Sequence, residues 1–319
     1  MTAQSAALAP TKELETIEVR PMAMTIGAEI FGADLTKPLP EKQREEIYAT
    51  FLKWKVVFFR AQNLNNDQQV AFARQLGVCS PAHPVNGYQD PAYPEIYSLD
   101  KNSRSKRYKG GDLVNPWSGW HADITAAVNP PSISILRGDV VPPYGGDTQF
   151  ADMVLAYQEL SPKMRELVDG LRCIHRYQGN YAVGIRKEYQ ERIEKNLLIS
   201  EHPLVTIHPE TGERVLYISP NFVQSIVDVT PTESEALLYM LKTHAARPEF
   251  NVRFRWGAGD VIMWDNRQAL HRAPRDVINS DFPREVHRIT LFGKVPVGVD
   301  GRESSIVEGK PLEPVEAHI

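Results

Sequence analysis

The stretch GWHADITAAVNPP, residues 119–131, places a histidine and an aspartate two positions apart in otherwise apolar surroundings. If residues 120–125 are extended, His121 and Asp123 project from one face of a strand, because side chains alternate with a period of two. Two such ligands could bind one side of an octahedral metal ion. The chain contains nine histidines, so one pair of this kind also arises by chance, and a metal site needs a third ligand from elsewhere.

The best candidate for that third ligand is His271, in MWDNRQALHRAPR (263–275), just after a strand-like run that ends at Trp264. Two histidines and one carboxylate leave three coordination positions open, which is diagnostic of non-haem Fe(II) oxygenases. Zinc more often takes three or four nitrogen or sulfur ligands. The two cysteines, Cys79 and Cys173, have no CxxC spacing. The mixed nitrogen and oxygen donors therefore favour iron.

Two arginines, Arg284 and Arg288, lie four residues apart where RDVINSDFPREVHRITLFG (275–293) enters a strand-like run. An arginine binds a carboxylate through a two-pronged contact that a lysine cannot match. A dicarboxylate that chelates a metal at one end needs such an anchor at the other, and 2-oxoglutarate is a ligand of this kind. A surface salt bridge with Glu285 is the alternative role for Arg284.

Helices are predicted where capping residues precede amphipathic segments. A helix is expected over about 41–53, followed by a buried strand over 56–59. A second begins after Asn65 or Asn66 and ends near Gly77. In the next predicted helix, Ser161 is the N-cap, Pro162 lies in the first turn and Gly170 ends the helix. Thr230, Pro231 and Glu233 form a capping box at the start of TPTESEALLYMLKTHA.

Short strand-like runs separate these helices, bounded by Gly, Pro, Asn or Asp. HPETGER (208–214) is typical of a hairpin turn between two of them. Because the strands do not alternate one-for-one with helices, they favour a mainly β, α+β fold with a jelly-roll core and flanking helices over a doubly wound parallel sheet. The runs are 132–136, 203–207, 214–218, 260–264 and 288–295.

The composition is that of an ordinary globular protein, with 42% hydrophobic and 24% charged residues among 319. The net charge of −4 offers no broad field for nucleic acid or an anionic membrane. No run approaches the ~20 apolar residues of a membrane-spanning helix, and the N-terminus lacks the pattern of a signal peptide. We therefore expect a cytoplasmic protein with neither a nucleic-acid nor a membrane partner.

Taken together, the motifs resemble the Fe(II)/2-oxoglutarate dioxygenases of the taurine and 2,4-dichlorophenoxyacetate dioxygenase type. The resemblance covers about residues 20–298 and implies a double-stranded β-helix, or jelly roll. It is consistent with one domain over 16–298, a disordered tail over 1–15 and a C-terminal tail over 299–319. It rests on IGAEIFGADLTKPL (26–39), KVVFFRAQNL (55–64), WHADIT (120–125), PPYGGDTQFADM (142–153), GDVIMWDNRQALHR (259–272) and REVHRITLFG (284–293).

The resemblance implies roles for individual residues. His121, Asp123 and His271 would be the catalytic iron ligands. Thr148 of GGDT and Arg284 would grip the distal carboxylate of 2-oxoglutarate. Arg288 and His83 would hold the anionic group of the primary substrate, although Arg288 has a rival role at the near carboxylate of 2-oxoglutarate, and His83 a rival structural role.

Three features depart from the family pattern or extend it. Ala126 stands where relatives often have an aromatic residue, which would enlarge or reshape the substrate pocket. Trp117 and Tyr88 are candidates for the pocket wall. The loop 101–119 is longer and more basic than usual, so it could act as a mobile lid.

The implied reaction consumes O2 and 2-oxoglutarate at Fe(II), forms succinate and CO2, and hydroxylates a small anionic substrate such as a sulfonate, alkyl sulfate or aryloxyalkanoate. Hydroxylation next to a heteroatom gives an unstable product that collapses. The alternatives are desaturation or N-oxidation of an amino-acid-like substrate, a metal-dependent hydrolase, and a non-catalytic binder on a jelly-roll fold. By family analogy the protein would be a dimer or tetramer.

Overall fold

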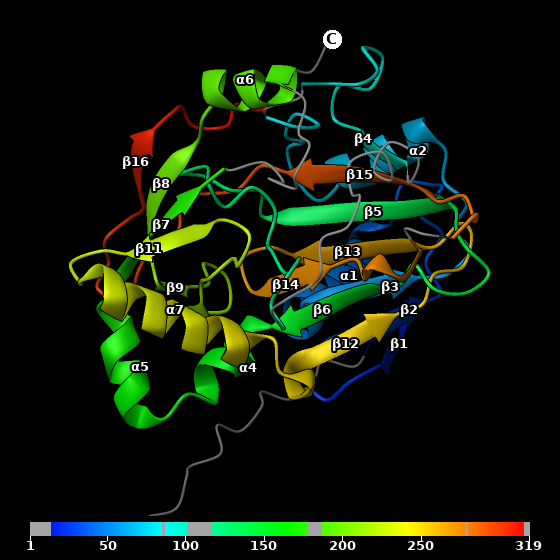
Figure 1. Cartoon of the computed structure of the whole chain (residues 1–319). Helices are drawn as coiled ribbons and strands as arrows, with labels where there is room; N and C mark the ends of the chain where they lie inside the picture. Colours follow the sequence, from blue (N-terminus) through cyan, green and yellow to red (C-terminus); the bar gives the residue numbers. More distant parts are fainter. Residues whose placement is uncertain (1–13, 85–86, 101–115, 178–186, 278–279, 316–319) are drawn as a thin grey trace, which may run out of the picture.

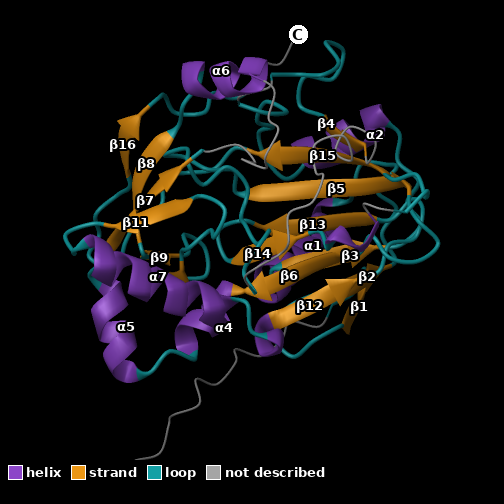
Figure 2. Cartoon of the chain, viewed as in Figure 1, coloured by secondary structure: helices purple, strands orange, loops and turns teal. Residues whose placement is uncertain are grey.

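The structure is a computed structural model that describes residues 14–84, 87–100, 116–177, 187–277 and 280–315, and it is mostly sheet with flanking helices (Figures 1 and 2). Its largest element is a seven-stranded sheet. Neighbouring strands in this sheet are antiparallel except for β2 and β3, which agrees with the expected absence of a doubly wound sheet. Its strands, in spatial order, are β1 (Glu18–Pro21), β2 (Ala28–Phe31), β3 (Val56–Phe59), β13 (Val261–Asp265), β5 (Ile133–Val140), β15 (Glu285–Leu291) and β4 (Tyr97–Asp100).

A three-stranded sheet packs against one face of the seven-stranded sheet. Phe58 of β3 stacks on Phe254 with ring centroids 4.4 Å apart, and Phe150 lies 5.6 Å from Trp264 of β13. These rings belong to one buried cluster, so aromatic packing fixes the distance between the two sheets. The strands of the smaller sheet, in spatial order, are β12 (Asn251–Phe254), β6 (Thr148–Asp152) and β14 (Ala269–Arg272).

Strand β3 shows why the sequence folds into layers here. Its four residues, VVFF, are all buried, and alternate side chains join different clusters: Val56 and Phe58 face the smaller sheet, whereas Val57 and Phe59 pack with Phe51 of α1 (Glu41–Trp54). Helix α2 (Asn66–Arg74) covers the same face. A strand with apolar residues on both sides is buried between two layers, as the continuous hydrophobic run predicts.

Most of the remaining elements lie on the left in Figure 1, and several of them pack around a separate apolar cluster. Helices α4 (Met153–Gln158) and α7 (Pro231–Ala245) contribute Met153, Val154 and Leu241 to it. The strands there are β11 (Val223–Ile226), β7 (Arg172–Arg176), β8 (Ile199–Pro203) and β16 (Ser305–Glu308), with the pair β10 (Arg214–Leu216) and β9 (Val205–Ile207). The remaining helical elements are α5 (Pro162–Asp169), α6 (Lys187–Lys195), η1 (Pro248–Phe250) and η2 (Arg275–Val277).

The predicted helix starts are confirmed. Asn65 is the N-cap of α2 and forms a capping box with Gln68, Ser161 caps α5, and Thr230 forms the predicted capping box with Glu233 at the start of α7. The predicted hairpin is also present, since β9 and β10 pair antiparallel across residues 208–213. Local hydrogen-bonding chemistry therefore determines where these elements begin.

The predicted strands are present with different bounds: the run 132–136 is β5, which continues to Val140, the run 214–218 ends at Leu216, and the run 260–264 is β13, one residue later. The run 203–207 is split, because β8 ends at Pro203 and β9 starts at Val205, and proline has no amide hydrogen to continue a ladder. The run 288–295 begins three residues earlier, at Glu285, and ends at Leu291. A side chain at Gly293 would meet the Pro130 carbonyl oxygen at 1.8 Å, so the chain crosses another segment there and leaves the sheet.

The segment predicted as a C-terminal tail contributes to the folded body. Its residues 305–308 form β16, which pairs with β8, and the Val315 amide donates to the Cys79 carbonyl. The predicted N-terminal tail lies mainly outside the described residues. Among the helices that the structure describes, none is both long and apolar enough to cross a membrane.

Candidate metal centre

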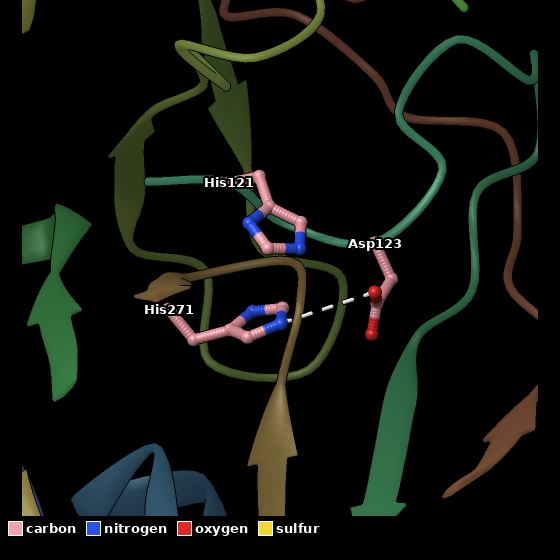
Figure 3. Close-up of side chains that lie close together, drawn as sticks. All are labelled: His121, Asp123 and His271. Carbon is pink, nitrogen blue, oxygen red and sulfur yellow. Dashed lines mark ion pairs between the residues drawn. The ribbon is translucent and has the colours of Figure 1, made fainter. Parts of the chain in front are cut away.

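His121, Asp123 and His271 converge on one point, with one potential ligand atom from each lying within 4.8 Å of the others (Figure 3). His271 Nε2 lies 3.9 Å from Asp123 Oδ1. The two imidazole rings are neighbours, with centroids 4.1 Å apart. In the part of the chain that the structure describes, this is the one group of at least three histidine, cysteine or acidic side chains with metal-binding geometry.

The backbone brings the two histidines together. His271 lies on β14, opposite Phe150 of β6, so the sheet register determines its position. On its other side, His271 exchanges two backbone hydrogen bonds with His121, of 3.0 Å and 2.7 Å. Residues 150 positions apart in sequence are therefore aligned by an isolated antiparallel bridge.

Residues 120–125 do not form a strand, so the condition under which His121 and Asp123 would share one strand face is not met. His121 makes only the isolated bridge, and the chain then enters a turn in which Ile124 has a φ of 49°. The Ala127 amide donates to the Ile124 carbonyl and closes this turn. Asp123 consequently reaches the site from a turn, and its alignment with His121 does not come from strand alternation.

A hydrogen bond selects the tautomer of His121. Its Nδ1 lies 2.9 Å from the Gly119 carbonyl oxygen, which can only accept, so Nδ1 carries the hydrogen. The lone pair of the neutral ring is then on Nε2, and such a backbone contact is the usual support for a metal-binding histidine. His121 can therefore bind a metal ion through the lone pair on Nε2.

The Asp123 carboxylate is held ionised although it is only 2% exposed. Burial by itself would raise its pKa, but the positive charge of Arg288, followed by the two histidines and the Ser134 hydroxyl, lowers the pKa to about 2. Arg288 Nη1 lies 2.5 Å from Asp123 Oδ1. One anionic oxygen donor and two imidazoles are the donor set that suits Fe(II), so these residues fit that ion.

The two residues predicted to bind 2-oxoglutarate lie at the starts of strands in different sheets. Thr148 begins β6, is 3% exposed, and its hydroxyl accepts a hydrogen bond of 3.0 Å from Trp256 Nε1. Arg284 comes directly before β15 and is 8% exposed. A Cβ at Gly146, two residues before Thr148, would lie 3.5 Å from Arg284 Cδ, so Arg284 runs beside the loop that leads into β6.

The residues predicted to hold a substrate anion are linked through Tyr97. The Arg288 guanidinium lies 5.5 Å from the centre of the Tyr97 ring, and the His83 ring lies 5.1 Å from it. His83 Nε2 is also 3.2 Å from the Tyr177 hydroxyl. His83 and Arg288 therefore share one aromatic neighbour, which the sequence interpretation did not single out.

The three predicted pocket-wall residues occupy different surroundings. Trp117 is partly buried and packs edge-on against Tyr239 of α7. Tyr88 is 61% exposed. Ala126 is fully buried in a cluster with Tyr177 and Phe222, and Phe222 lies 6.4 Å from the His121 ring. The basic residues of the proposed lid, 101–115, lie outside the described residues.

Two further residues at the site, Ser134 and Asn266, had no role in the sequence interpretation. The Ser134 hydroxyl donates to Asp123 Oδ2 at 2.6 Å, and Asn266 Oδ1 accepts from the Asp123 amide at 3.0 Å. The position of Asn266 between the strand ending near Trp264 and His271 was the available signal. Ser134 could not be recognised, because serine in a strand is unremarkable.

Most other histidines that the structure describes have structural surroundings. His175 and His202 are fully buried and both contact Thr125, through its hydroxyl and its carbonyl respectively. Burial lowers the pKa of His202 to about 4 and holds that of His175 well below its usual value. His208 pairs with the buried Asp265 at 3.1 Å.

Comparisons with known proteins match this chain to one family of dioxygenases and to individual proteins with related names. A model of the family described as taurine catabolism dioxygenase TauD, TfdA family matches residues 18–290. An alpha-ketoglutarate-dependent sulfate ester dioxygenase of Pseudomonas putida is 38% identical, covering 94% of this chain and 97% of its own. An alkylsulfatase of Acinetobacter baylyi is 33% identical, with coverages of 95% and 92%.

Solved structures agree with these matches. A taurine dioxygenase from Burkholderia xenovorans is 49% identical, with a TM-score of 0.81 and coverage of 92% of this chain and 97% of that one. A structure of AAD-2 in complex with Mn(II) and N-oxalylglycine is 27% identical, with a TM-score of 0.72 and coverages of 88% and 99%. Because the match spans nearly the whole fold and includes the metal-binding motif, the chain belongs to the TauD, TfdA family of dioxygenases.

Proposed function

We propose that this enzyme hydroxylates small organic sulfate esters. As a family member it is a 2-oxoglutarate-dependent dioxygenase that uses Fe(II), 2-oxoglutarate and O2. Two relatives that match 94% and 95% of this chain, at 38% and 33% identity, are named for sulfate esters and alkyl sulfates, whereas a 2,4-dichlorophenoxyacetate dioxygenase of Cupriavidus pinatubonensis is 31% identical over 87% of the chain. This difference favours sulfate esters over aryloxyalkanoates.

The observation that carries the proposal is the position of Arg288. Its guanidinium is permanently charged, lies 2.5 Å from a carboxylate oxygen of the metal centre, and packs against Tyr97. An anionic substrate group bound there would hold its neighbouring carbon close to the metal. His83, whose ring lies 5.1 Å from that of Tyr97, is the second residue we assign to the anion.

We assign the metal to His121, Asp123 and His271, and the distal carboxylate of 2-oxoglutarate to Thr148 and Arg284. When bound, Fe(II) supplies the redox chemistry that couples decarboxylation of 2-oxoglutarate, to succinate and CO2, with oxidation of a substrate C–H bond. The chain itself positions the reactants and limits access of water, since Asp123, His271 and Arg284 are more than nine-tenths buried and His121 is partly buried.

Hydroxylation of the carbon that bears the sulfate oxygen explains how an oxygenase can release sulfate. The product carries a hydroxyl and a sulfate ester on one carbon, and it collapses to an aldehyde and sulfate as the C–O bond to sulfate breaks and the hydroxyl loses its proton. This collapse needs no further oxidant.

We also propose a fold, a cellular location and an oligomeric state for this enzyme. The two facing sheets are consistent with a double-stranded β-helix, or jelly roll, and residues 16–298 with one catalytic domain to which the following segment adds β16. A cytoplasmic location suits an enzyme that consumes 2-oxoglutarate, and a homodimer or homotetramer is the assembly we expect. The substrate is a small anion.

The test is to reconstitute the purified full-length protein anaerobically with Fe(II) and 2-oxoglutarate, add O2, and measure succinate with each of three substrate sets. We expect linear alkyl sulfates to give succinate, aldehyde and sulfate in equal amounts, and to be turned over faster than alkyl sulfonates or aryloxyacetates. Faster turnover of either other set would contradict the substrate assignment. Sulfate release without O2 would indicate a hydrolase instead.

A further inference from the structure

The two oxygens of the Asp123 carboxylate have different partners. Oδ1 faces the metal centre, 3.9 Å from His271 Nε2, and accepts from Arg288. Oδ2 accepts a hydrogen bond of 2.6 Å from Ser134 Oγ. Ser134 lies on β5 and is fully buried, so the strand fixes this hydroxyl in place.

The side-chain amide of Asn266 determines which way the Ser134 hydroxyl points. Asn266 Oδ1 lies 3.0 Å from the Asp123 amide nitrogen and 3.0 Å from Trp264 Nε1. Both of these groups can only donate, so the amide oxygen must face them and the amide nitrogen must face Ser134 Oγ, at 2.8 Å. That nitrogen donates to the Ser134 oxygen, which leaves the hydroxyl hydrogen for Asp123 Oδ2.

We propose that Ser134 and Asn266 are positioning residues that commit Asp123 to bind the metal through Oδ1 alone. The inference rests on the proposed metal ligands. It follows from a closed ring of hydrogen bonds, in which Asn266 contacts the backbone of Asp123 directly and the carboxylate of Asp123 through Ser134. With every member at most 3% exposed, water does not compete for these bonds.

Such a device matters because the turn that carries Asp123 has no strand ladder to hold it. A carboxylate that could rotate would be able to bind through both oxygens and occupy one of the positions that 2-oxoglutarate and O2 require. The Ser134 hydrogen bond opposes this rotation by engaging Oδ2. Residues that orient metal ligands in this way typically change metal affinity by about 10–100-fold when they are removed.

The experiment measures Co(II) binding to the full-length protein under anaerobic conditions, by competition with a chelator, together with the visible spectrum of bound Co(II). We expect Ser134→Ala to weaken Co(II) binding by about 10-fold and to change the spectrum, because the carboxylate gains freedom. Ser132→Ala is the matched control. The Ser132 hydroxyl donates to the Phe292 carbonyl, so this variant loses a nearby hydrogen bond that does not involve Asp123, and it should bind Co(II) like wild type.

A second variant, Asn266→Ala, tests whether the ring acts as a unit. It should also weaken Co(II) binding, and the double variant with Ser134→Ala should lose less than the product of the two single losses. Wild-type affinity and spectrum in Ser134→Ala, or strictly multiplicative losses, would overturn the inference.

Asp123→Ala separates this failure from failure of the ligand assignment. If Asp123→Ala loses Co(II) binding while Ser134→Ala does not, only the positioning role is wrong. If Asp123→Ala binds Co(II) like wild type, the proposed metal ligands are wrong. Thermal melting of each metal-free variant establishes that the compared proteins are folded.

Discussion

Two neighbouring residues of the proposed metal centre are held by different physical means. His271 lies within the ladder of β14 and β6, where backbone hydrogen bonds fix its position. Asp123 lies in a turn with a left-handed residue, Ile124, and is held by side chains: Ser134 and Asn266 on one side, and Arg288 on the other. We call the surroundings of His271 the sheet side of the centre and those of Asp123 the turn side. Because backbone hydrogen bonds survive a change of side chain, we expect the sheet side to tolerate substitutions better than the turn side.

The largest expected effect is that of Asp123→Ala on the turn side. It should abolish succinate formation, because it removes the anionic metal ligand. It should also lower the free energy of unfolding of the metal-free protein by about 3–5 kcal/mol, since it leaves the largely buried Arg288 without its carboxylate partner. Urea denaturation measures the second effect.

His271→Ala is the comparison for Asp123→Ala. It should abolish activity equally but cost less stability, because its backbone bridge to His121 persists. An equal loss of stability in the two variants would remove the distinction between the sheet side and the turn side.

The next effect concerns Arg284. This residue directly precedes β15, so the start of a strand determines its position. Arg284→Ala should raise the KM for 2-oxoglutarate on the order of 10²-fold, as expected when a charge-assisted contact of about 3 kcal/mol is lost. Stability should change little. The control is Arg255→Ala, whose exposed guanidinium donates to the Pro143 carbonyl in the neighbouring loop. An unchanged KM in Arg284→Ala would assign the carboxylate to another residue.

The contrast between the two sides also explains what the sequence could predict. The helix starts at Asn65, Ser161 and Thr230 follow from local patterns, and they were predicted correctly. His271 was selected from a local motif, and the structure places it with His121 and Asp123. The motif around Asp123 identified the residue but not its conformation. The sequence interpretation considered residues 120–125 as extended. The turn that they form instead depends on contacts with residues far from Asp123 in the sequence.

Those distant contacts leave no local signature. Ser134 and Asn266 are 11 and 143 positions from Asp123, and nothing in the sequence near either residue indicates that they meet. The same holds for Tyr97, which joins Arg288 to His83. Side-chain networks between separate elements are therefore the part of the site that requires the three-dimensional fold.

A smaller effect is expected at Thr125, a residue of the turn that contacts the buried side chains of His175 and His202. Thr125→Val keeps the shape of the side chain but removes the hydroxyl that contacts His175 Nδ1 at 2.9 Å. It should lower the free energy of unfolding by about 1–3 kcal/mol, because a buried polar group loses its partner. Thr206→Val, at a buried position in β9, is the control, and a similar loss there would indicate a general effect of the substitution.

The smallest effect is a pH dependence that arises on the turn side. Burial lowers the pKa of His202 to about 4, whereas an unfolded histidine titrates near 6.5. Between these values the unfolded state binds the extra proton, so stability falls as the pH falls from about 6.5 to 4, by up to about 1.4 kcal/mol per pH unit for this residue. His175 acts in the same direction. The lowered pKa of Asp123 and Asp265 costs stability only at lower pH, below about 4, where unfolded carboxylates take up protons.

Urea denaturation of the metal-free protein at pH 7.5, 6.0 and 5.0 measures this dependence, and His202→Gln isolates the contribution of one residue. The variant should show a shallower slope between pH 6 and 5, because glutamine does not titrate, although it is less stable at pH 7.5 through loss of the Thr125 contact. Hydrogen exchange adds the spatial test: relative to the intrinsic exchange rate at each pH, lowering the pH should reduce the protection of the Ala127 amide in the turn more than that of the His271 amide in the bridge. If both amides respond equally, acid acts on the whole domain, and the histidines do not support the turn separately from the sheet.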